Sequence, residues 1–329
     1  MKKSKVLYSF VLLALVLIIS FLMDPSSKAT TEEERPVVGV LQFVSHPALD
    51  EIYRGVKAGL AENGYPADKV TIAFQNGQGD QSKLQTMSQQ LAQKADVLVG
   101  IATPAAQALA NTTQELPIVL GAVSDPVSAG LVKNEEKPGG LITGVSDKSP
   151  VDAQMKLIQD LLPQAKTMGI LYSSAEDNSR YQAEQIQGEA EKAGLKVKTY
   201  PVPSTNEIAQ TVQVLSQEVD VLYIPTDNTI ASAMQTVVSE ADKAKLPIIP
   251  SVDTMVSEGG LATVGINQFE LGKQTGKMAA EILQGADPAE MPIYTFSSGD
   301  IILNEAKAAQ LGITIPQAIK EKAQLVSND

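Results

Sequence analysis

Short apolar runs alternate with amphipathic stretches along the chain from Val37 onward. Val37–Leu41 is a continuous apolar run after Pro36, which predicts a strand buried on both faces. Residues 48–63 carry apolar side chains at near-helical spacing, and Gly64 suits the end of that helix. The alternation predicts right-handed βαβ units and a parallel sheet covered by helices on both faces. Further elements are predicted as strands at 70–74, 97–101, 117–120 and 141–145 and as a helix at 81–94.

The same alternation recurs about 130 residues later, which indicates an internal duplication. Gly39 and Gly64 are matched at that interval by Gly169 and Gly194, and Leu-Pro-Ile occurs at both 116 and 246. The fold class is therefore predicted as α/β, with two similar Rossmann-like lobes, each a parallel sheet flanked by helices, and a cleft between them that suits a small molecule. Strands of the second copy are predicted at 168–172, 197–202, 219–224, 247–250 and 262–266.

The residues after the second copy are too few for a third domain. A helix is predicted at 269–283, strands near 293–296 and at 301–303, and a last amphipathic segment from 304 to 311. If the helix at 269–283 packs on the first lobe (lobe 1) and the segment at 304–311 packs on the second lobe (lobe 2), the chain crosses between the lobes three times. These crossings predict a three-segment hinge. The predicted domains are a signal or anchor segment with its linker at 1–35, lobe 1 at 36–145 plus 268–298, and lobe 2 at 146–267 plus 299–329.

The first residues form a different kind of segment. Lys2, Lys3 and Lys5 precede an uncharged run from Val6 to Met23, which is typical of an export signal. As a helix this run spans ~27 Å, close to the thickness of a bilayer, so it suits a retained anchor, whereas the small residues around Lys28 suit cleavage and release. The lysines predict a body on the outer face of the cytoplasmic membrane. With no cysteine in the chain, a lipid anchor on cysteine is excluded.

Composition narrows the class of function. A net charge of −12 argues against a nucleic-acid partner, because phosphate backbones are bound through clustered lysines and arginines. The chain has no cysteine and a single histidine, His46, and contains no GxSxG, HExxH or Walker motif, so we expect neither an enzyme nor a cofactor. A transcription regulator would need a helix-turn-helix module where the export segment stands.

Loops at the carboxyl ends of the strands are the expected place for a ligand, because helix N-termini present free N–H groups there. The first-copy loops at 102–104 and 122–126 are rich in hydroxyls, and the matching second-copy loops add Asp227 and Asp253. Hydroxyls beside free N–H groups suit a carboxylate and Asp suits an ammonium, so together they predict an amino acid zwitterion. The same residue types are also common helix caps, and only their convergence favours binding.

Six segments carry a family resemblance. The chain from Val37 to about Pro316 resembles the substrate-binding proteins of ABC importers with the type I periplasmic-binding fold, in the branch associated with tryptophan and other aromatic amino acids. This resemblance implies capture of an amino acid between the lobes and delivery to an ABC permease in the membrane, with its ATPase on the inner side. The segments are VGVLQFVSHPALDEIYRGVKAGL at 38–60, VGIATPAAQALAN at 99–111, GAVSDPVSAGLV at 121–132, ILYSSAEDNS at 170–179, YIPTDNTIASAM at 223–234 and PSVDTMVSEGGLAT at 250–263.

Carried onto this chain, the resemblance implies three groups of ligand contacts. The carboxylate would be bound by Thr103, Ser124, Ser174 and Asn178, the ammonium by Asp227 and Asp253, and the side chain near Gln42, Phe43 and Asn228. Two alternatives stay open: an exported ligand-binding sensor or adhesin subunit, and a binding protein for a sugar or a branched-chain amino acid. Sugar sites stack on aromatic rings, and a chain with 4% aromatics and no tryptophan offers few.

Overall fold

The computed structural model describes residues 35–326, so the predicted export segment at 6–23 lies outside the described residues. The first lobe is built on one sheet of six parallel strands in the order β11-β5-β4-β3-β1-β2. Its central strands are apolar and buried on both faces, as the sequence predicts. The strands are β1 (Val37–Gln42), β2 (Thr71–Asn76), β3 (Val97–Ile101), β4 (Ile118–Gly121), β5 (Ile142–Ser146) and β11 (Tyr294–Thr295).

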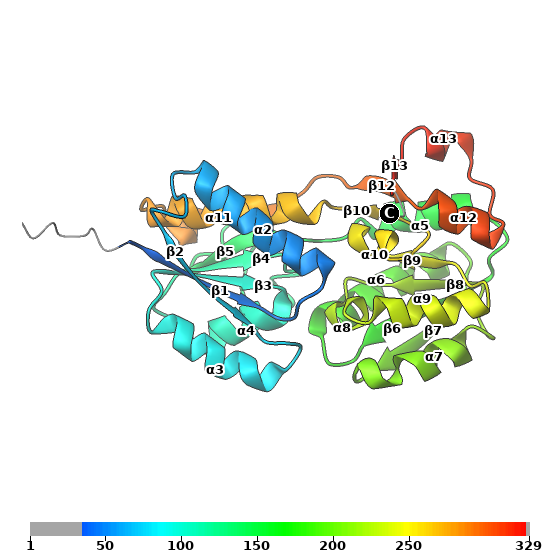
Figure 1. The fold of residues 1–329 in the computed structure, drawn as a ribbon, viewed down its shortest axis with the longest axis horizontal. Helices are drawn as coiled ribbons and strands as arrows, with labels where there is room; N and C mark the ends of the chain where they lie inside the picture. The colour runs from blue at the N-terminus through cyan, green and yellow to red at the C-terminus, as the bar shows by residue number, and fades with distance from the viewer. Residues whose placement is uncertain (1–34, 327–329) are drawn as a thin grey trace, which may run out of the picture. The chain divides into compact units, whose positions relative to one another are not determined.

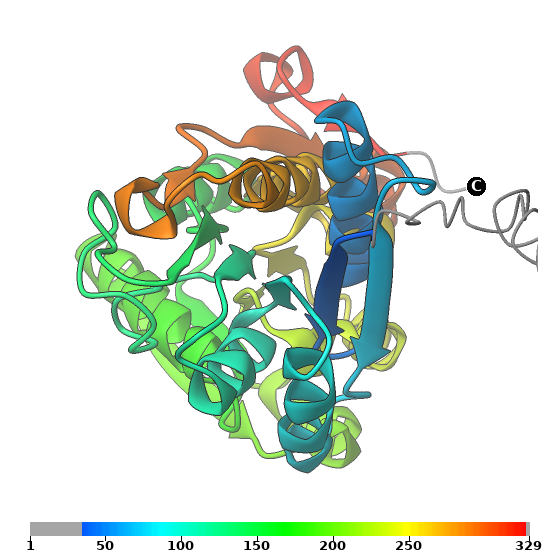
Figure 2. The same cartoon turned by 90° about the vertical axis from the view of Figure 1, so that its left-hand side faces the viewer.

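Helices cover both faces of this sheet. On one face α2 (Pro47–Glu62) lies beside α11 (Gln268–Leu283), and on the other α3 (Gln81–Ala92) lies beside α4 (Thr103–Thr112) (Figures 1 and 2). The helix predicted near 269–283 therefore packs on the first lobe, where Leu271 and Met278 join its core.

Glycines bring α2 and α11 into backbone contact. A Cβ on Gly272 would lie 2.0 Å from the carbonyl oxygen of Ile52, and one on Gly276 would lie 2.2 Å from that of Val56. Gly55 and Gly59 meet the backbone of α11 in the same way. Since only glycine leaves room for such an approach, these four residues let α11, which follows the second lobe in the sequence, pack directly on α2 of the first lobe.

The second lobe repeats the arrangement on a smaller sheet, in the order β7-β6-β8-β9, again with parallel pairs. Alternate residues of these strands face two cores, one under α5 and α6 and the other under α7, α8 and α9. The strands are β6 (Thr167–Ser173), β7 (Lys196–Val202), β8 (Val221–Ile224) and β9 (Ile248–Pro250), and the helices are α5 (Val151–Leu161), α6 (Asp177–Lys192), α7 (Ile208–Leu215), α8 (Asn228–Ala231) and α9 (Met234–Lys243).

The last strands depart from the duplication. The sequence predicts that β10 (Ala262–Gly265) extends the second parallel sheet, but only one bond reaches β9, from the N–H of Leu261 to the carbonyl of Ile248 at 2.7 Å. Instead β10 pairs antiparallel with β12 (Asp300–Leu303), because the chain returning from the first lobe occupies its free edge. This third sheet ends with β13 (Gln324–Leu325), and the remaining elements are α10 (Asp253–Ser257), α12 (Glu305–Leu311), α13 (Gln317–Lys320) and short 3₁₀ turns at Thr205–Glu207 and Pro288–Glu290.

The chain passes between the lobes after β5, after β10 and before β12. Parallel sheets flanked by helices in two lobes confirm the predicted fold class, while the residue limits of the domains stay a prediction. The duplicated glycines Gly64 and Gly194 both end helices with positive φ, +97° and +87°. Within residues 35–326, no helix combines the length and the apolar character needed to cross a membrane.

Candidate ligand-binding site

A cavity lies between the two lobes, at the carboxyl ends of their strands. Both lobes and the first hinge segment contribute to its lining, as expected for parallel sheets whose strands end at one edge. The lining residues are His46, Ala48, Leu49, Ile52, Ala102, Thr103, Ala122, Ser124 and Gln268 from the first lobe, Asp147 from the first hinge segment, and Asn178, Thr226, Asp227, Asn228, Ala231 and Val252 from the second lobe.

Five of the nine residues predicted from the sequence line this cavity: Thr103, Ser124, Asn178, Asp227 and Asn228. All five are at least nine-tenths buried. They come from four different loops, which the fold brings to one place.

The other four predicted residues have their described contacts elsewhere. Gln42 donates through Nε2 to Asp50 Oδ1 at 2.7 Å, and the side chain of Phe43 packs in the first-lobe core. Exposed Ser174 donates to the carbonyl of Val202 at 3.3 Å, and Asp253 accepts from the N–H of Thr254. Gln42, Phe43, Ser174 and Asp253 are thus absent from the cavity lining, and ligand contact for them stays a prediction.

The first-lobe side of the cavity contains strained backbone at the start of α4. Ala102, which precedes α4, has φ 75° and ψ 155°, a region that residues other than glycine rarely adopt at a cost of about 1–3 kcal/mol. Ala122, after β4, also has a positive φ of 60°. Among the described contacts, no hydrogen bond uses the N–H groups of Thr103 and Ala105, which belong to the first turn of α4. Free N–H groups at a helix N-terminus beside the Thr103 hydroxyl suit a carboxylate.

The apolar wall of the cavity is aliphatic. Ala48, Leu49 and Ile52 from α2 line it, together with Ala231 and Val252 from the second lobe. Apart from the imidazole of His46, the lining residues include no aromatic ring. Tyr223 of β8 is fully buried and donates to Gln154 Oε1 at 2.6 Å, so its ring belongs to the core of the second lobe.

Asp227 is a helix cap in this structure. Its Oδ1 accepts from the N–H of Ile230 at 2.8 Å, and its Oδ2 accepts from the N–H of Ser173 at 2.5 Å. Burial, and then the neighbouring Glu176 carboxylate, raise the pKa of Asp227 to about 7. The capping role considered in the sequence is confirmed, and both carboxylate oxygens already have partners.

Glu176 is a buried carboxylate that the sequence reasoning missed. Its Oε1 accepts from the N–H and the hydroxyl of Thr229 at 2.8 and 2.7 Å, and its Oε2 accepts from Asn228 Nδ2 at 2.5 Å. The available signal was a carboxylate inside the loop at 173–179, whose other residues are mostly small and polar. No lysine or arginine is among the residues that line the cavity, so no cationic side chain of the lining pairs with the acidic residues there.

His46 joins the two lobes across the cavity. Its Nε2 lies 3.2 Å from Asn228 Oδ1, and the Asn228 amide is oriented by the bond from its Nδ2 to Glu176. Because Asn228 Oδ1 can only accept, Nε2 carries the proton and Nδ1 is left as an acceptor. Burial lowers the pKa of His46 to about 4, so the ring is neutral at physiological pH.

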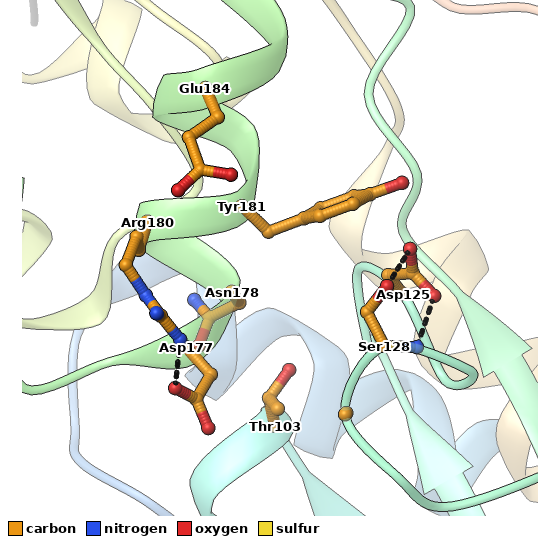
Figure 3. Close-up of a pocket in the computed structure, with 9 residues that line it drawn as sticks. Thr103, Asp125, Ser128, Asp177, Asn178, Arg180, Tyr181 and Glu184 are labelled. Carbon is orange, nitrogen blue, oxygen red and sulfur yellow. Dashed lines mark hydrogen bonds and ion pairs between the residues drawn. The ribbon is translucent and has the colours of Figure 1, made fainter.

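A second pocket adjoins the cavity, and the two share Thr103 and Asn178, both labelled in Figure 3. Figure 3 shows Tyr181 of α6 extending toward the loop of Asp125, which is closed by bonds from Ser128. Burial, and then the neighbouring Asp125 carboxylate, raise the pKa of Tyr181 to about 12, so its hydroxyl is protonated at physiological pH.

Two further bonds connect the lobes outside the cavity. Gln81 Nε2 donates to the carbonyl of Ala175 at 2.8 Å, and Gln107 Nε2 donates to Asp177 Oδ2 at 3.3 Å. The cavity is therefore closed on several sides by contacts between lobes.

Comparison with known proteins identifies the family. The sequence profile described as ABC transporter substrate binding protein matches residues 37–327. This chain belongs to that family. The tyrosine-binding protein of Clostridioides difficile (strain R20291) is 37% identical over 281 residues, which are 85% of this chain and 81% of that protein.

Solved structures agree. The ABC domain in complex with L-Trp from Streptococcus pneumonia is 53% identical and superposes with a TM-score of 0.87 over 89% of this chain and 100% of that chain. The ligand-free, open structure of a substrate binding protein with adhesive properties from Clostridium difficile is 39% identical, with a TM-score of 0.68 over the same shares. A leucine-binding protein from Thermotoga maritima, 15% identical over 73% of this chain and 67% of its own with a TM-score of 0.51, shares the fold alone.

Family membership confirms the resemblance inferred from the sequence, and the fold is the type I periplasmic-binding fold. It also implies an extracytoplasmic place of action and a membrane ABC transporter as partner. Proteins of this family bind and hand over solutes, in line with the expectation of a binding protein rather than an enzyme.

Proposed function

We propose that this protein captures an aromatic amino acid between its two lobes, as the solute-binding component of an ABC importer. The observation that carries this proposal is the buried cavity between the lobes, which places free N–H groups, acceptor side chains and an aliphatic wall around one space. The relatives named for L-Trp and tyrosine support an aromatic ligand.

The ligand is oriented by the chemistry of the two sides. Its carboxylate binds at the start of α4, where the N–H groups of Thr103 and Ala105 and the hydroxyl of Thr103 are available. The ligand's aromatic ring packs against Leu49 and Ile52 of α2. An aliphatic wall of methyl and methylene groups suits a flat ring as well as a wall of aromatic side chains does.

Ligand capture involves closure of the lobes, and the present structure corresponds to the closed form. A conserved domain protein of Vibrio cholerae, 35% identical, superposes with a TM-score of 0.87, as the L-Trp complex does. The open structure reaches only 0.68 at a higher identity of 39%, so divergence of sequence does not explain the difference, whereas a change in lobe placement does.

We further propose that the segment at 6–23 directs export and that the body acts at the outer face of the cytoplasmic membrane, either anchored or released. The support is the sequence pattern alone, because this segment lies outside the described residues. From there the loaded protein delivers its amino acid to the permease.

A thermal-shift screen tests the proposed ligand. Residues 36–329 form a compact unit and can be screened against the proteinogenic amino acids, sugars and polyamines. A ligand present at one hundred times its Kd stabilises the fold by about 2.7 kcal/mol through mass action. We expect the largest shift from L-tryptophan, L-phenylalanine or L-tyrosine. A larger shift from a sugar, a polyamine or a branched-chain amino acid would overturn the assignment.

A further inference from the structure

Three buried polar atoms that line the cavity have no hydrogen-bond partner in the described part of the chain. They are His46 Nδ1, Asp147 Oδ1 and Asn178 Oδ1. A buried polar group without a partner costs roughly 1–3 kcal/mol, so such groups are rare and call for an explanation. Their gathering around one cavity indicates that a ligand supplies the missing partners.

Asp147 is the charged member of this group. It follows β5 directly, on the first hinge segment, and its side chain is only 7% exposed. The Ser124 hydroxyl neighbours the carboxylate, and Oδ1 has no hydrogen-bond partner in the described part of the chain. The neighbouring Lys148 is exposed and no lysine or arginine is among the lining residues, so nothing there neutralises the charge. Burial raises the pKa of Asp147 to about 6, as expected for a carboxylate held without a cation.

The other two atoms are also acceptors. Asn178 Nδ2 donates to the carbonyl of Thr226 at 2.9 Å, which turns its Oδ1 to the unpartnered position. His46 Nδ1 is an acceptor because Nε2 holds the proton that bonds to Asn228. The three atoms thus call for a donor of up to three hydrogen bonds with a positive charge, and an ammonium group has both properties.

We propose that Asp147 supplies the carboxylate that binds the ligand's ammonium group, with Asn178 Oδ1 and His46 Nδ1 as the accompanying acceptors. This assignment rests on the proposed function and deepens it. It differs from the sequence-based one, because each oxygen of Asp227 already accepts from a backbone N–H whereas Asp147 Oδ1 accepts from none, and because Asp253 is absent from the cavity lining.

Titration calorimetry on the full-length protein in mild detergent tests this assignment with two ligands, L-tryptophan and indole-3-propionate, which lacks only the ammonium. Asp147→Asn should raise the Kd for L-tryptophan about 30-fold or more, because the ammonium loses its charged partner. The same variant should change the Kd for indole-3-propionate less than about threefold, because that ligand makes no use of the carboxylate. Asp147→Ser provides a second neutral variant should the first fail to fold.

Glu258→Gln is the matched control. Glu258 is also a partly buried carboxyl with an unpartnered oxygen and a raised pKa, but it does not line the cavity. We expect its Kd for L-tryptophan to stay within about threefold of wild type.

Three results would overturn the assignment: wild-type protein that binds indole-3-propionate as tightly as L-tryptophan, an Asp147 variant that keeps wild-type affinity for L-tryptophan, or one that weakens both ligands equally. Failure of the proposed function looks different. If another amino acid binds in place of the aromatic ones, the aromatic assignment is wrong, and the same comparison with that amino acid and its deamino analogue still decides the role of Asp147. If no amino acid binds, both proposals are wrong.

Discussion

Asp227 shows how one side chain can satisfy a structural pattern and a functional one. A carboxylate just after a strand and before a helix is predicted equally well as a cap and as an ammonium ligand. The structure assigns both of its oxygens to backbone N–H groups, those of Ile230 and Ser173. These two hydrogen bonds hold the loop that carries Asn228, and through it the contact with His46.

Replacing Asp227 separates these two roles. Asp227→Ala removes a helix cap and leaves the buried N–H of Ser173 without a partner, so we expect the free energy of unfolding to fall by roughly 2–4 kcal/mol. Asp227→Asn keeps one capping oxygen and should lose less stability. Denaturant titration measures both variants.

The affinity of Asp227→Asn then decides between the two carboxylates. We expect its Kd for L-tryptophan to rise less than about tenfold, and less than that of Asp147→Asn, since the cap acts on the ligand only through Asn228 and His46. If Asp227→Asn loses more affinity for L-tryptophan than Asp147→Asn does, Asp227 and not Asp147 binds the ammonium group of the ligand.

At the scale of elements, the contact between α2 and α11 joins two distant parts of the sequence in one lobe. The two helices precede and follow the second lobe in the sequence, and each carries two glycines four residues apart. Because α2 also supplies the aliphatic wall of the cavity, this contact positions Leu49 and Ile52.

Gly276→Ala should therefore destabilise the protein strongly. The added Cβ would lie 2.2 Å from the carbonyl oxygen of Val56, which forces the helices apart, so we expect a loss of roughly 3 kcal/mol or more in the free energy of unfolding. Gly188→Ala, within α6, is the control: its Cβ would meet nothing within 4 Å, and alanine is the better helix former by about 1 kcal/mol. Equal stability of the two variants in thermal unfolding would contradict the packing argument.

At the scale of the whole binding body, the contacts between lobes define a closed form. They join His46 to Asn228 inside the cavity, and Gln81 to Ala175 and Gln107 to Asp177 outside it. Each of these bonds is lost if the lobes separate, so the balance between open and closed forms depends on a few weak contacts and on the ligand that joins both sides.

Closure can be followed in solution. We expect the radius of gyration of the 36–329 body to fall when L-tryptophan saturates it, because groups from both lobes bind one small molecule. Gln81→Ala removes one lobe-to-lobe bond without touching the cavity, and it should raise the Kd about fivefold, the value of one net hydrogen bond of about 1 kcal/mol. A radius that stays constant at saturation, with binding measured in parallel, would rule out closure on the ligand.

Much of the architecture was determined by the sequence itself. Local patterns predicted the strands of both lobes within a few residues, because a buried parallel strand is a short apolar run and the end of a helix needs a residue such as Gly64 or Gly194. The rule that ligands bind at the carboxyl ends of strands selected the loops of Thr103, Ser124, Asn178 and Asp227, all of which line the cavity.

The tertiary structure alone decided which polar atoms face the ligand. Asp147 follows β5 directly, just as the predicted site residues follow the other strands. The sequence around it indicates a segment that crosses between the lobes. Only the packing shows that its Oδ1 is buried without a hydrogen-bond partner. Ser174 and Phe43 stand in the selected loops, yet their side chains point to a neighbouring strand end and to the core. The strand that pairs with β10 is β12, which lies nearly forty residues later in the sequence. Sequence patterns carry the period of an element and its preferred ends, whereas the pairing of single atoms depends on residues that become neighbours only when the chain has folded.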